Sequence, residues 1–490
     1  MRDFARLVED CDSLIKAGRV AEASKRLLGL NSARVPREWR LPLANLCRRS
    51  GLISTGMKLL FQVVYPERSR VHEEPASSGE LAEYGVLLHR FGSLRESVEI
   101  LRRADPAVAP ETLLFQAFCH FNRWEYAASV PMLEQYVSMQ TLPYQRFIGE
   151  VNLSAALVWS EQWERARDVV TKNIATAHEQ NYGRLEGNSY ELRAQIHIYR
   201  RDFVSARADL EASSKLLGTS GVVDSLFVRK WQTILESFES KDVTKLISLR
   251  QEAIERRDGE TAREADRFRL LISFDAATFD HLLFGTPYPE FRKMLCRQMR
   301  QAPSKLEYLV GAEGARTLDI ATGELATSEG KVETFKPGGK CHKVLDVLSR
   351  DFYRPTSLGG LFTELFPGEH FDVFSSPGRI HQILFRTRAW AKERGMPVEV
   401  KESDGFYSLS MGPGFALRVP YQHGDVSGPA IQWQKLDSLL AGSREFTAKE
   451  AREKLGIPRT SLQRLLVWAE SEKKIERIGE YNSTLYRLAV

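Results

Sequence analysis

The chain has few cysteines, and they are not arranged as a disulfide framework or a metal site. Five cysteines occur in 490 residues, and no two of them have the Cys-x-x-Cys spacing of a structural zinc site or a thiol redox motif. They stand at widely separated positions, which are Cys11, Cys47, Cys119, Cys296 and Cys341. We expect free thiols in a reducing compartment, as is typical of a cytoplasmic protein.

The sequence also lacks a long apolar run and a strong excess of charge. No apolar stretch approaches the roughly 18 residues that a membrane-spanning helix requires, and the N-terminal residues lack the apolar core of a signal peptide. We therefore expect no membrane partner. The net charge of +5 is small for 490 residues, so any nucleic-acid-binding surface has to be a local feature. The length predicts about three or four domains.

Motifs of the common catalytic sites are absent as well. The run PGGKCH at 337–342 is close to a phosphate-binding loop, but Thr334 stands where that loop has its first glycine, and Cys341 replaces its hydroxyl residue. The chain has no HExxH or GxSxG motif, and its ten histidines are dispersed. We therefore expect no catalytic residue, no cofactor and no bound metal, and we predict that the protein is not an enzyme.

Residues 1–300 are strongly helical and contain a repeated pattern. After a short turn, a bulky residue is followed three positions later by a small one. The pairs recur 30 to 41 residues apart, at Val20/Ala23, Ile53/Gly56, Leu94/Ser97, Trp124/Ala127, Trp163/Ala166 and Phe203/Ala206, with a weaker copy at Val243/Leu246. The small residue lets the two helices of a hairpin approach, while the bulky residue fills the space between neighbouring hairpins.

This pattern, over about residues 1–275, resembles the tetratricopeptide (TPR) repeat in a degenerate form of variable length. The resemblance implies a curved α-solenoid whose concave face binds a protein or a peptide; a spacer or a dimerisation arm is the alternative. Aromatic candidates for that face, which are equally well explained as core residues, are Tyr84, Phe115, Tyr126, Tyr190 and Tyr199. The polar run 69–80 predicts an exposed loop, and the two prolines of 286–290 interrupt the helical pattern.

The stretch 376–409 has the pattern of a helix followed at once by a β-hairpin. Residues at three- and four-residue steps form an apolar stripe, which consists of Ile380, Ile383, Leu384, Thr387 and Ala391. The segment 376–395 carries five basic residues and one acidic residue, a net charge of +4. The following residues alternate like two strands around a turn at Asp404-Gly405. A solvated face would carry more carboxylates, so we favour a DNA-binding face that gains affinity from counterion release.

Residues 301–411 resemble the OmpR/PhoB-type effector domain, in which a small sheet precedes three helices and a wing. The resemblance rests on the order of predicted elements and on residues that match the family pattern, which are Phe335-Lys336-Pro337, Val344, Leu345, Leu348, Arg388 and Tyr407. It implies DNA contacts from the helix by His381, Arg386 and Arg388. Further predicted DNA contacts on the polar and basic helix and its hairpin are Arg379, Gln382, Lys401 and Ser403. Thr387, Trp390 and Phe406 depart from the pattern. No receiver domain precedes the module, so any regulation has to come from the repeat array.

Residues 412–430 are rich in glycine and proline and are predicted to be a linker. Residues 431–490 resemble the broad winged-helix group, with capping-box spacing at Thr447 and Glu450 and a wing that turns at Asn482-Ser483. The resemblance implies DNA contacts from the start of the second helix, by Arg459, Thr460, Ser461, Gln463 and Arg464. Nearby glutamates weaken the basic face, and many such modules bind protein, so both roles stay open.

The predicted fold class is mainly α, with a TPR-like α-solenoid followed by two small α+β winged-helix domains. The predicted function is that of a cytoplasmic transcription regulator whose array binds a protein or peptide and whose winged helices bind double-stranded DNA, as a homodimer that reads repeated half-sites. The alternative is a non-catalytic scaffold in which the repeats and winged helices make only protein-protein contacts. DNA affinity separates the two, because it is salt-dependent for the regulator and weak or absent for the scaffold.

Overall fold

The chain folds into two compact units. The computed structural model describes residues 4–68, 74–218, 222–311, 316–326, 332–334, 338–423, 428–440, 444–479 and 484–489. The first unit consists of residues 1–302 together with 357–379, and the second consists of 303–356 together with 380–490. The first unit therefore includes a segment that the sequence places within the OmpR/PhoB-like module. The predicted division into a repeat array and two winged-helix domains stays a prediction.

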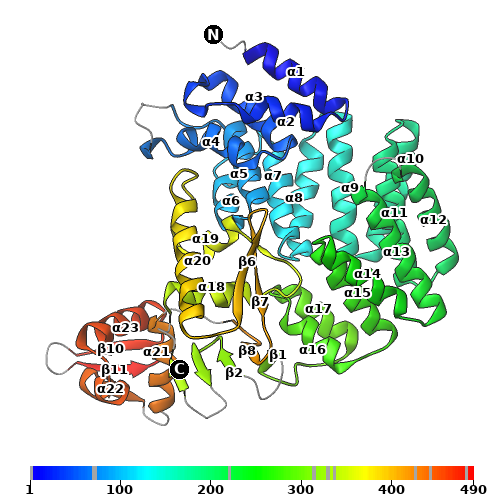
Figure 1. Ribbon diagram of the computed structural model, residues 1–490. Coiled ribbons are helices and arrows are strands. Elements are labelled where there is room, and N and C mark those ends of the chain that lie inside the picture. The colour runs from blue at the N-terminus through cyan, green and yellow to red at the C-terminus, as the bar shows by residue number, and fades with distance from the viewer. Residues whose placement is uncertain are drawn as a thin grey trace. The chain divides into compact units, whose positions relative to one another are not determined.

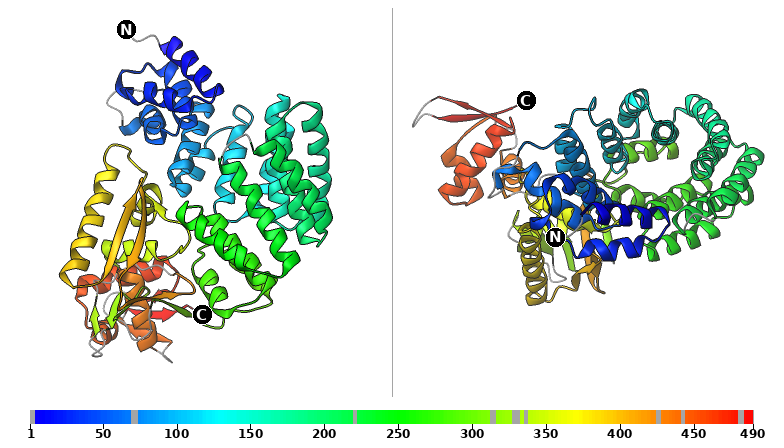
Figure 2. Two further views of the ribbon diagram at one scale, coloured as in Figure 1. Left: turned by 45° about the vertical axis from the view of Figure 1, so that its right-hand side comes forward. Right: turned by 90° about the horizontal axis from the view of Figure 1, so that it is seen from above.

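The first unit is an array of helical hairpins that follow one another along the chain (Figure 1). Seen from above, the hairpins curve around in succession (Figure 2, right). The helices are α1 (Phe4–Lys16), α2 (Val20–Leu28), α3 (Arg37–Arg49), α4 (Ile53–Val64), α5 (Ser78–Phe91), α6 (Leu94–Leu101), α7 (Glu111–Phe121), α8 (Tyr126–Met139), α9 (Pro143–Trp159), α10 (Trp163–Glu179), α11 (Gly183–Tyr199), α12 (Phe203–Leu217), α13 (Val222–Ser240), α14 (Thr244–Glu255), α15 (Gly259–Ile272), α16 (Ala276–Phe284) and α17 (Pro289–Met299). The predicted helical-repeat fold is confirmed.

The repeated bulky–small pairs mark the start of the second helix of a hairpin. The bulky residues that begin α2, α4, α6, α10 and α12 are Val20, Ile53, Leu94, Trp163 and Phe203. Their small partners are buried, and a Cβ added to Gly56 would lie only 2.9 Å from Leu87 of the next hairpin. The predicted pair Trp124/Ala127 is wrong by two residues, because α8 begins at Tyr126. Its buried small residue is Ser129, while Ala127 is exposed.

The last helices of the array are tied back to its middle by residues far apart in the sequence. The indole nitrogen of Trp124 donates a hydrogen bond to Glu260 of α15 (3.1 Å). Arg297 and Gln298 of α17 both donate to Glu161, which follows α9 (2.5 and 3.0 Å). These contacts hold the C-terminal helices of the array against α7–α9.

The aromatic side chains considered for the concave face pack as core residues do. Tyr84 is fully buried, and the other four are half-buried. Arginine guanidinium groups lie over three of the half-buried rings, in the pairs Arg48–Phe115, Arg193–Tyr190 and Arg267–Tyr199. Arg267 has no exposed surface and donates to the Tyr199 hydroxyl (2.6 Å). Of the two roles considered for these rings, their contacts favour the core.

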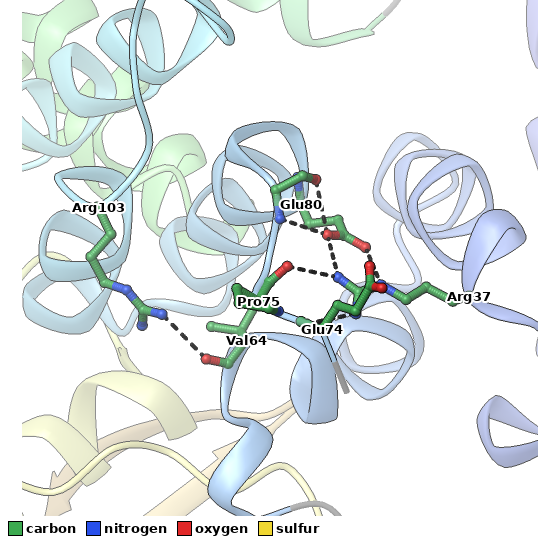
Figure 3. Close-up of polar contacts among 7 residues, drawn as sticks. Arg37, Val64, Glu74, Pro75, Glu80 and Arg103 are labelled. Carbon is green, nitrogen blue, oxygen red and sulfur yellow. Dashed lines mark hydrogen bonds and ion pairs between the residues drawn. The ribbon is translucent and has the colours of Figure 1, made fainter. Parts of the chain in front are cut away.

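The chain before α5 is held by a cationic side chain of α3. The guanidinium of Arg37 donates to the carbonyls of Glu74 (2.7 Å) and Pro75 (3.0 Å) and to the carboxylate of Glu80 (3.0 Å), as Figure 3 shows. The predicted loop 69–80 is therefore shorter than expected, since α5 already begins at Ser78. Glu74 and Pro75 are exposed, as predicted, and residues 69–73 lie outside the described part of the chain.

Ser77 caps helix α5, and the Ser77→Ala variant is expected to lower the free energy of unfolding of the first unit by about 1 kcal/mol. The Ser77 hydroxyl accepts from the N–H of Glu80 (3.3 Å), and the Glu80 carboxylate accepts from the N–H of Ser77 (2.8 Å). Ser93 stands at the same position before α6 but makes no capping bond, so Ser93→Ala is a matched control. Equal urea midpoints for the two variants would contradict the capping role.

The second unit begins with a five-stranded sheet in the order β1-β8-β2-β3-β4. Its strands are β1 (Glu307–Gly311), β2 (Arg316–Asp319), β3 (Glu324–Ala326), β4 (Val332–Thr334) and β8 (Phe415–Pro420). Strand β8 is antiparallel to β1 and parallel to β2. The predicted turn at Thr322-Gly323 lies between β2 and β3. The turn predicted at Glu329-Gly330 lies outside the described residues.

Strand β8 corrects the prediction that 412–430 is a linker. Phe415, Leu417 and Val419 are buried, and the strand lies inside the sheet between β1 and β2. Gly414, with a φ of +72°, turns the chain into the strand, and Pro420 ends it. The glycines and proline that suggested a linker are thus the boundaries of a buried strand.

The remaining elements of residues 338–411 match the predicted order of helices and hairpin. They are α18 (Lys340–Leu348), β5 (Thr356–Ser357), α19 (Leu358–Leu365), α20 (Ser376–Glu393), β6 (Val398–Ser403) and β7 (Phe406–Met411). The strands form a small sheet in the order β5-β7-β6. Val344, Leu345 and Leu348 of α18, which match the family pattern, are buried. Residues 335–337, which carry part of the family resemblance, lie outside the described part of the chain.

Residues 428–489 fold as a helix, a strand, two helices and a hairpin. The elements are α21 (Gly428–Leu439), β9 (Glu445–Thr447), α22 (Ala448–Leu455), α23 (Arg459–Ser471), β10 (Ile475–Ile478) and β11 (Leu485–Leu488), with the strands in the order β10-β11-β9. The predicted capping box of Thr447 and Glu450 is present, and Gly456 ends α22 with a φ of +62°. The wing turn predicted at Asn482-Ser483 lies outside the described residues.

Candidate nucleic-acid interface

Helix α20 is amphipathic in the way that the sequence predicts. The residues of the apolar stripe are buried, with exposed fractions of at most 8%, and are Ile380, Ile383, Leu384, Thr387 and Ala391. The residues of the outer face are exposed, and are His381, Gln382, Phe385, Arg386 and Arg388. Thr387 is the polar member of the stripe. Its buried hydroxyl is satisfied, because its Oγ1 donates a hydrogen bond to the carbonyl of Ile383 (2.9 Å).

Two exposed arginines of α20 differ in how far they are engaged within the protein. Arg388 donates from Nε to the carbonyl of Val400 in strand β6 (3.0 Å) and so joins the helix to the hairpin. Arg386 has no hydrogen-bond or ion-pair partner among the described residues. Arg386 is therefore the arginine of this face whose guanidinium is fully available to a ligand.

Arg379, which the sequence nominates as a DNA contact, is engaged within the first unit. Its guanidinium makes two hydrogen bonds to the carboxylate of Glu369 (2.7 and 3.1 Å). The same group lies 3.9 Å from the centre of the Phe366 ring. A phosphate would have to compete with both contacts, so the structure favours a structural role for Arg379.

The β6–β7 hairpin presents both predicted contact residues, but it is acidic. The chain reverses in a two-residue turn at Asp404 and Gly405, whose φ angles are +53° and +78°. Lys401 and Ser403 are exposed. Glu399, Glu402 and Asp404 are exposed beside them, and these carboxylates repel phosphate. The hairpin is therefore a weaker electrostatic surface for DNA than the helix.

The second predicted interface lies at the start of α23. Ala451 of α22 packs in one core with apolar residues of α23, which are Leu462, Leu465, Leu466 and Ala469. This packing leaves the polar side of α23 facing outward. Of the five nominated residues, Arg459, Thr460, Gln463 and Arg464 are exposed, while Ser461 is half-buried. The five residues therefore lie together at the start of α23.

The segment just before α20 is anchored on the repeat array, which the sequence did not reveal. We call residues 366–376 the anchor segment. The Phe371 ring is completely buried, with its centre 4.6 Å from that of Phe91 and 5.2 Å from that of Phe362. The Glu96 carboxylate of α6 accepts from the backbone N–H of Phe371 (2.9 Å) and from the Tyr65 hydroxyl (2.6 Å). The chain that leads into α20 is thus fixed to helices α4–α6 and α19.

Burial raises the pKa of Glu96 to about 7, against the hydrogen bonds from Tyr65 and Phe371, which lower it. The ordinary pKa of about 4.3 describes the unfolded chain, so Glu96 favours the folded state most at low pH and loses this contribution as the pH rises through 7. We expect the first unit to be less stable at pH 8 than at pH 6, with a Glu96 contribution of at most about 1.4 kcal/mol per pH unit. In Glu96→Gln the stability should vary less with pH. Urea unfolding at pH 6 and pH 8 measures the free energy of unfolding of both proteins. An equal change between the two pH values in the wild type and in Glu96→Gln would refute the role of Glu96.

Other kinds of site have no support in the described residues. In the described part of the chain, no three His, Cys, Asp or Glu side chains are grouped so that they could hold a metal ion. None of the described helices combines the length and the apolar character needed to cross a bilayer. All five cysteines are free thiols, and Cys11, Cys47 and Cys119 are buried.

Comparison with known proteins finds similarity in structure only. No family model matches the sequence, and neither does any curated protein. Eight solved chains match in structure, among them the C-terminal part of a TPR repeat-containing protein from Cytophaga hutchinsonii. It has 14% sequence identity and a TM-score of 0.30 over 56% of this chain and 98% of that chain. The helical-repeat fold rests on the hairpins of this chain, and so low a score adds nothing on function.

Proposed function

We propose that this protein is a non-catalytic transcription regulator that binds double-stranded DNA through helix α20. The observation that carries the proposal is the division of α20 into a buried apolar stripe and an exposed polar, basic face. A β-hairpin follows the helix at once, and Arg388 joins the two through Val400. An exposed helix with a basic face, backed by a small core and flanked by a hairpin, is the arrangement that a winged-helix domain inserts into the major groove.

The exposed residues of α20 suit the two kinds of contact that such a domain makes. Arg386 can neutralise a phosphate or donate to the O6 and N7 atoms of guanine. Gln382 can make paired hydrogen bonds to adenine. His381 lies one turn before Phe385 and offers a further polar group on the same face. The OmpR/PhoB-like assignment of residues 301–411 is part of this proposal.

The second helix pair extends the proposal to a second DNA contact. Arg459 and Arg464 are exposed on α23, with Thr460 and Gln463 exposed between them. Residues at the start of the second helix of such a pair face the bases when the helix enters the major groove. A homodimer would place two copies of each helix on repeated half-sites.

The helical-repeat array is proposed to bind a protein or peptide and to regulate DNA binding. The anchor segment supports the link, because Glu96 of the array holds the backbone of Phe371 only five residues before α20 begins. A partner that shifts helices α4–α6 would move this attachment. A partner that binds the folded array but not the unfolded chain would also raise the thermal stability of the array.

Binding of the full-length protein to fragmented genomic DNA across a salt series tests the proposal. The regulator is expected to retain a subset of fragments, with affinity that falls linearly on a log–log plot against salt concentration. Sequencing of the retained fragments would then reveal the operator. No retention of any fragment at low salt would refute DNA binding.

A non-catalytic scaffold is the second candidate, and the acidic hairpin favours it. Glu399, Glu402 and Asp404 are exposed near Lys401 in the hairpin that a DNA-binding wing would present to phosphate. In a scaffold the hairpin and the helix pair would contact proteins only. This candidate predicts no salt-dependent DNA affinity, so the same salt series separates it from the regulator.

A further inference from the structure

Phe385 is an apolar exception on the outer face of α20. Its side chain is 70% exposed, whereas the large aliphatic residues of the helix, Ile380, Ile383 and Leu384, are buried. Phe385 makes no ring contact with another aromatic residue in the part of the chain that the structure describes. Packing within the unit therefore does not explain a phenylalanine at this position.

The neighbours of Phe385 on the helix indicate that its ring contacts DNA bases. On a helix, residues three and four apart share a face, so Phe385 lies beside His381, Gln382 and Arg388. All three are exposed, and Arg386 follows directly. An apolar ring surrounded by donors of this kind fits the major groove, where the C5-methyl group of thymine is the apolar feature of the base edges.

We propose that Phe385 determines sequence specificity by packing its ring against the C5-methyl group of a thymine. The inference rests on the proposed function, because it requires α20 to enter the major groove. It adds a defined requirement, which is a T·A pair within each half-site. Gln382, one turn earlier on the same face, is placed to contact an adenine of the same or the neighbouring pair.

Replacement of thymine by uracil tests the proposal, since it removes the methyl group and leaves the base pairing unchanged. Duplexes that the full-length protein selects from a random pool would be remade with uracil at each thymine in turn. We expect one position per half-site at which uracil weakens binding about fourfold, the factor that corresponds to one buried methyl group. In Phe385→Ala the same exchange should change affinity by less than about 1.5-fold.

Phe406 provides a matched control, because it is also an exposed phenylalanine (42%) of the second unit but lies at the hairpin turn. Phe406→Ala should keep the full uracil penalty. A uracil penalty that persists in Phe385→Ala, or none in the wild type, would overturn the role of Phe385 and leave DNA binding intact. If the full-length protein selects no duplex at all, both the role of Phe385 and the proposed function are refuted.

Discussion

The full-length Arg386→Ala variant is expected to bind its DNA site about tenfold to a hundredfold more weakly than the wild-type protein. Arg386 is exposed on the basic face of α20 and has no hydrogen-bond or ion-pair partner among the described residues. Its guanidinium can therefore bind DNA without breaking a contact within the protein. If Arg386 neutralises one phosphate, its loss should also reduce the steepness of the log–log salt dependence by about one. Fluorescence anisotropy with a labelled duplex at several salt concentrations measures both quantities.

Arg379→Ala is the matched control for Arg386→Ala. Both residues belong to the same helix and carry the same charge, but Arg379 is bonded to Glu369 and lies over Phe366. We therefore expect Arg379→Ala to leave the salt dependence unchanged. Equal losses of affinity in the two variants would show that general charge, not the outer face of α20, governs binding.

The Phe371→Ala variant is expected to lower the free energy of unfolding of the first unit by about 3–5 kcal/mol. The Phe371 ring is fully buried between Phe91 and Phe362, so its removal leaves a cavity as well as losing buried apolar area. Urea unfolding, followed by far-UV circular dichroism, measures the change.

Phe374→Ala is the control for this effect, since Phe374 belongs to the same anchor segment but is 56% exposed. Its ring makes an edge contact with Phe61, with the centres 5.9 Å apart. We expect this variant to lose less than about 1 kcal/mol. A loss in Phe371→Ala no larger than that in Phe374→Ala would show that the anchor segment is not held by its buried ring.

The parts of the fold that depend on local patterns could be predicted from the sequence. The stripe of α20 and the small residues of the hairpins repeat at helical spacing, and burial of one face follows from that spacing. The turn at Asp404-Gly405 and the cap at Thr447 depend on residue types with strong local preferences. The predicted Trp124/Ala127 pair is wrong because two bulky residues, Trp124 and Tyr126, stand close together, and only the helix start distinguishes them.

The parts that depend on distant contacts could not be predicted. Strand β8 pairs with β1, which lies more than a hundred residues earlier in the chain. The sequence of β8 itself contains no pattern that predicts this pairing. Phe371 of the anchor segment and Glu96 are 275 residues apart in the sequence, so periodicity cannot predict their contact. The charge of Arg379 alone predicts a DNA contact, and its partner Glu369 lies in a loop to which no periodic pattern applies.

The ratio between specific and non-specific affinity is the sharpest test of sequence-specific DNA binding by this protein. The affinity of the full-length protein for a selected duplex would be measured beside its affinity for a scrambled duplex of the same composition, at one physiological salt concentration. A sequence-specific regulator is expected to prefer the selected duplex by about a thousandfold or more. A ratio near one, or no binding to either duplex, would contradict the regulator and favour the scaffold.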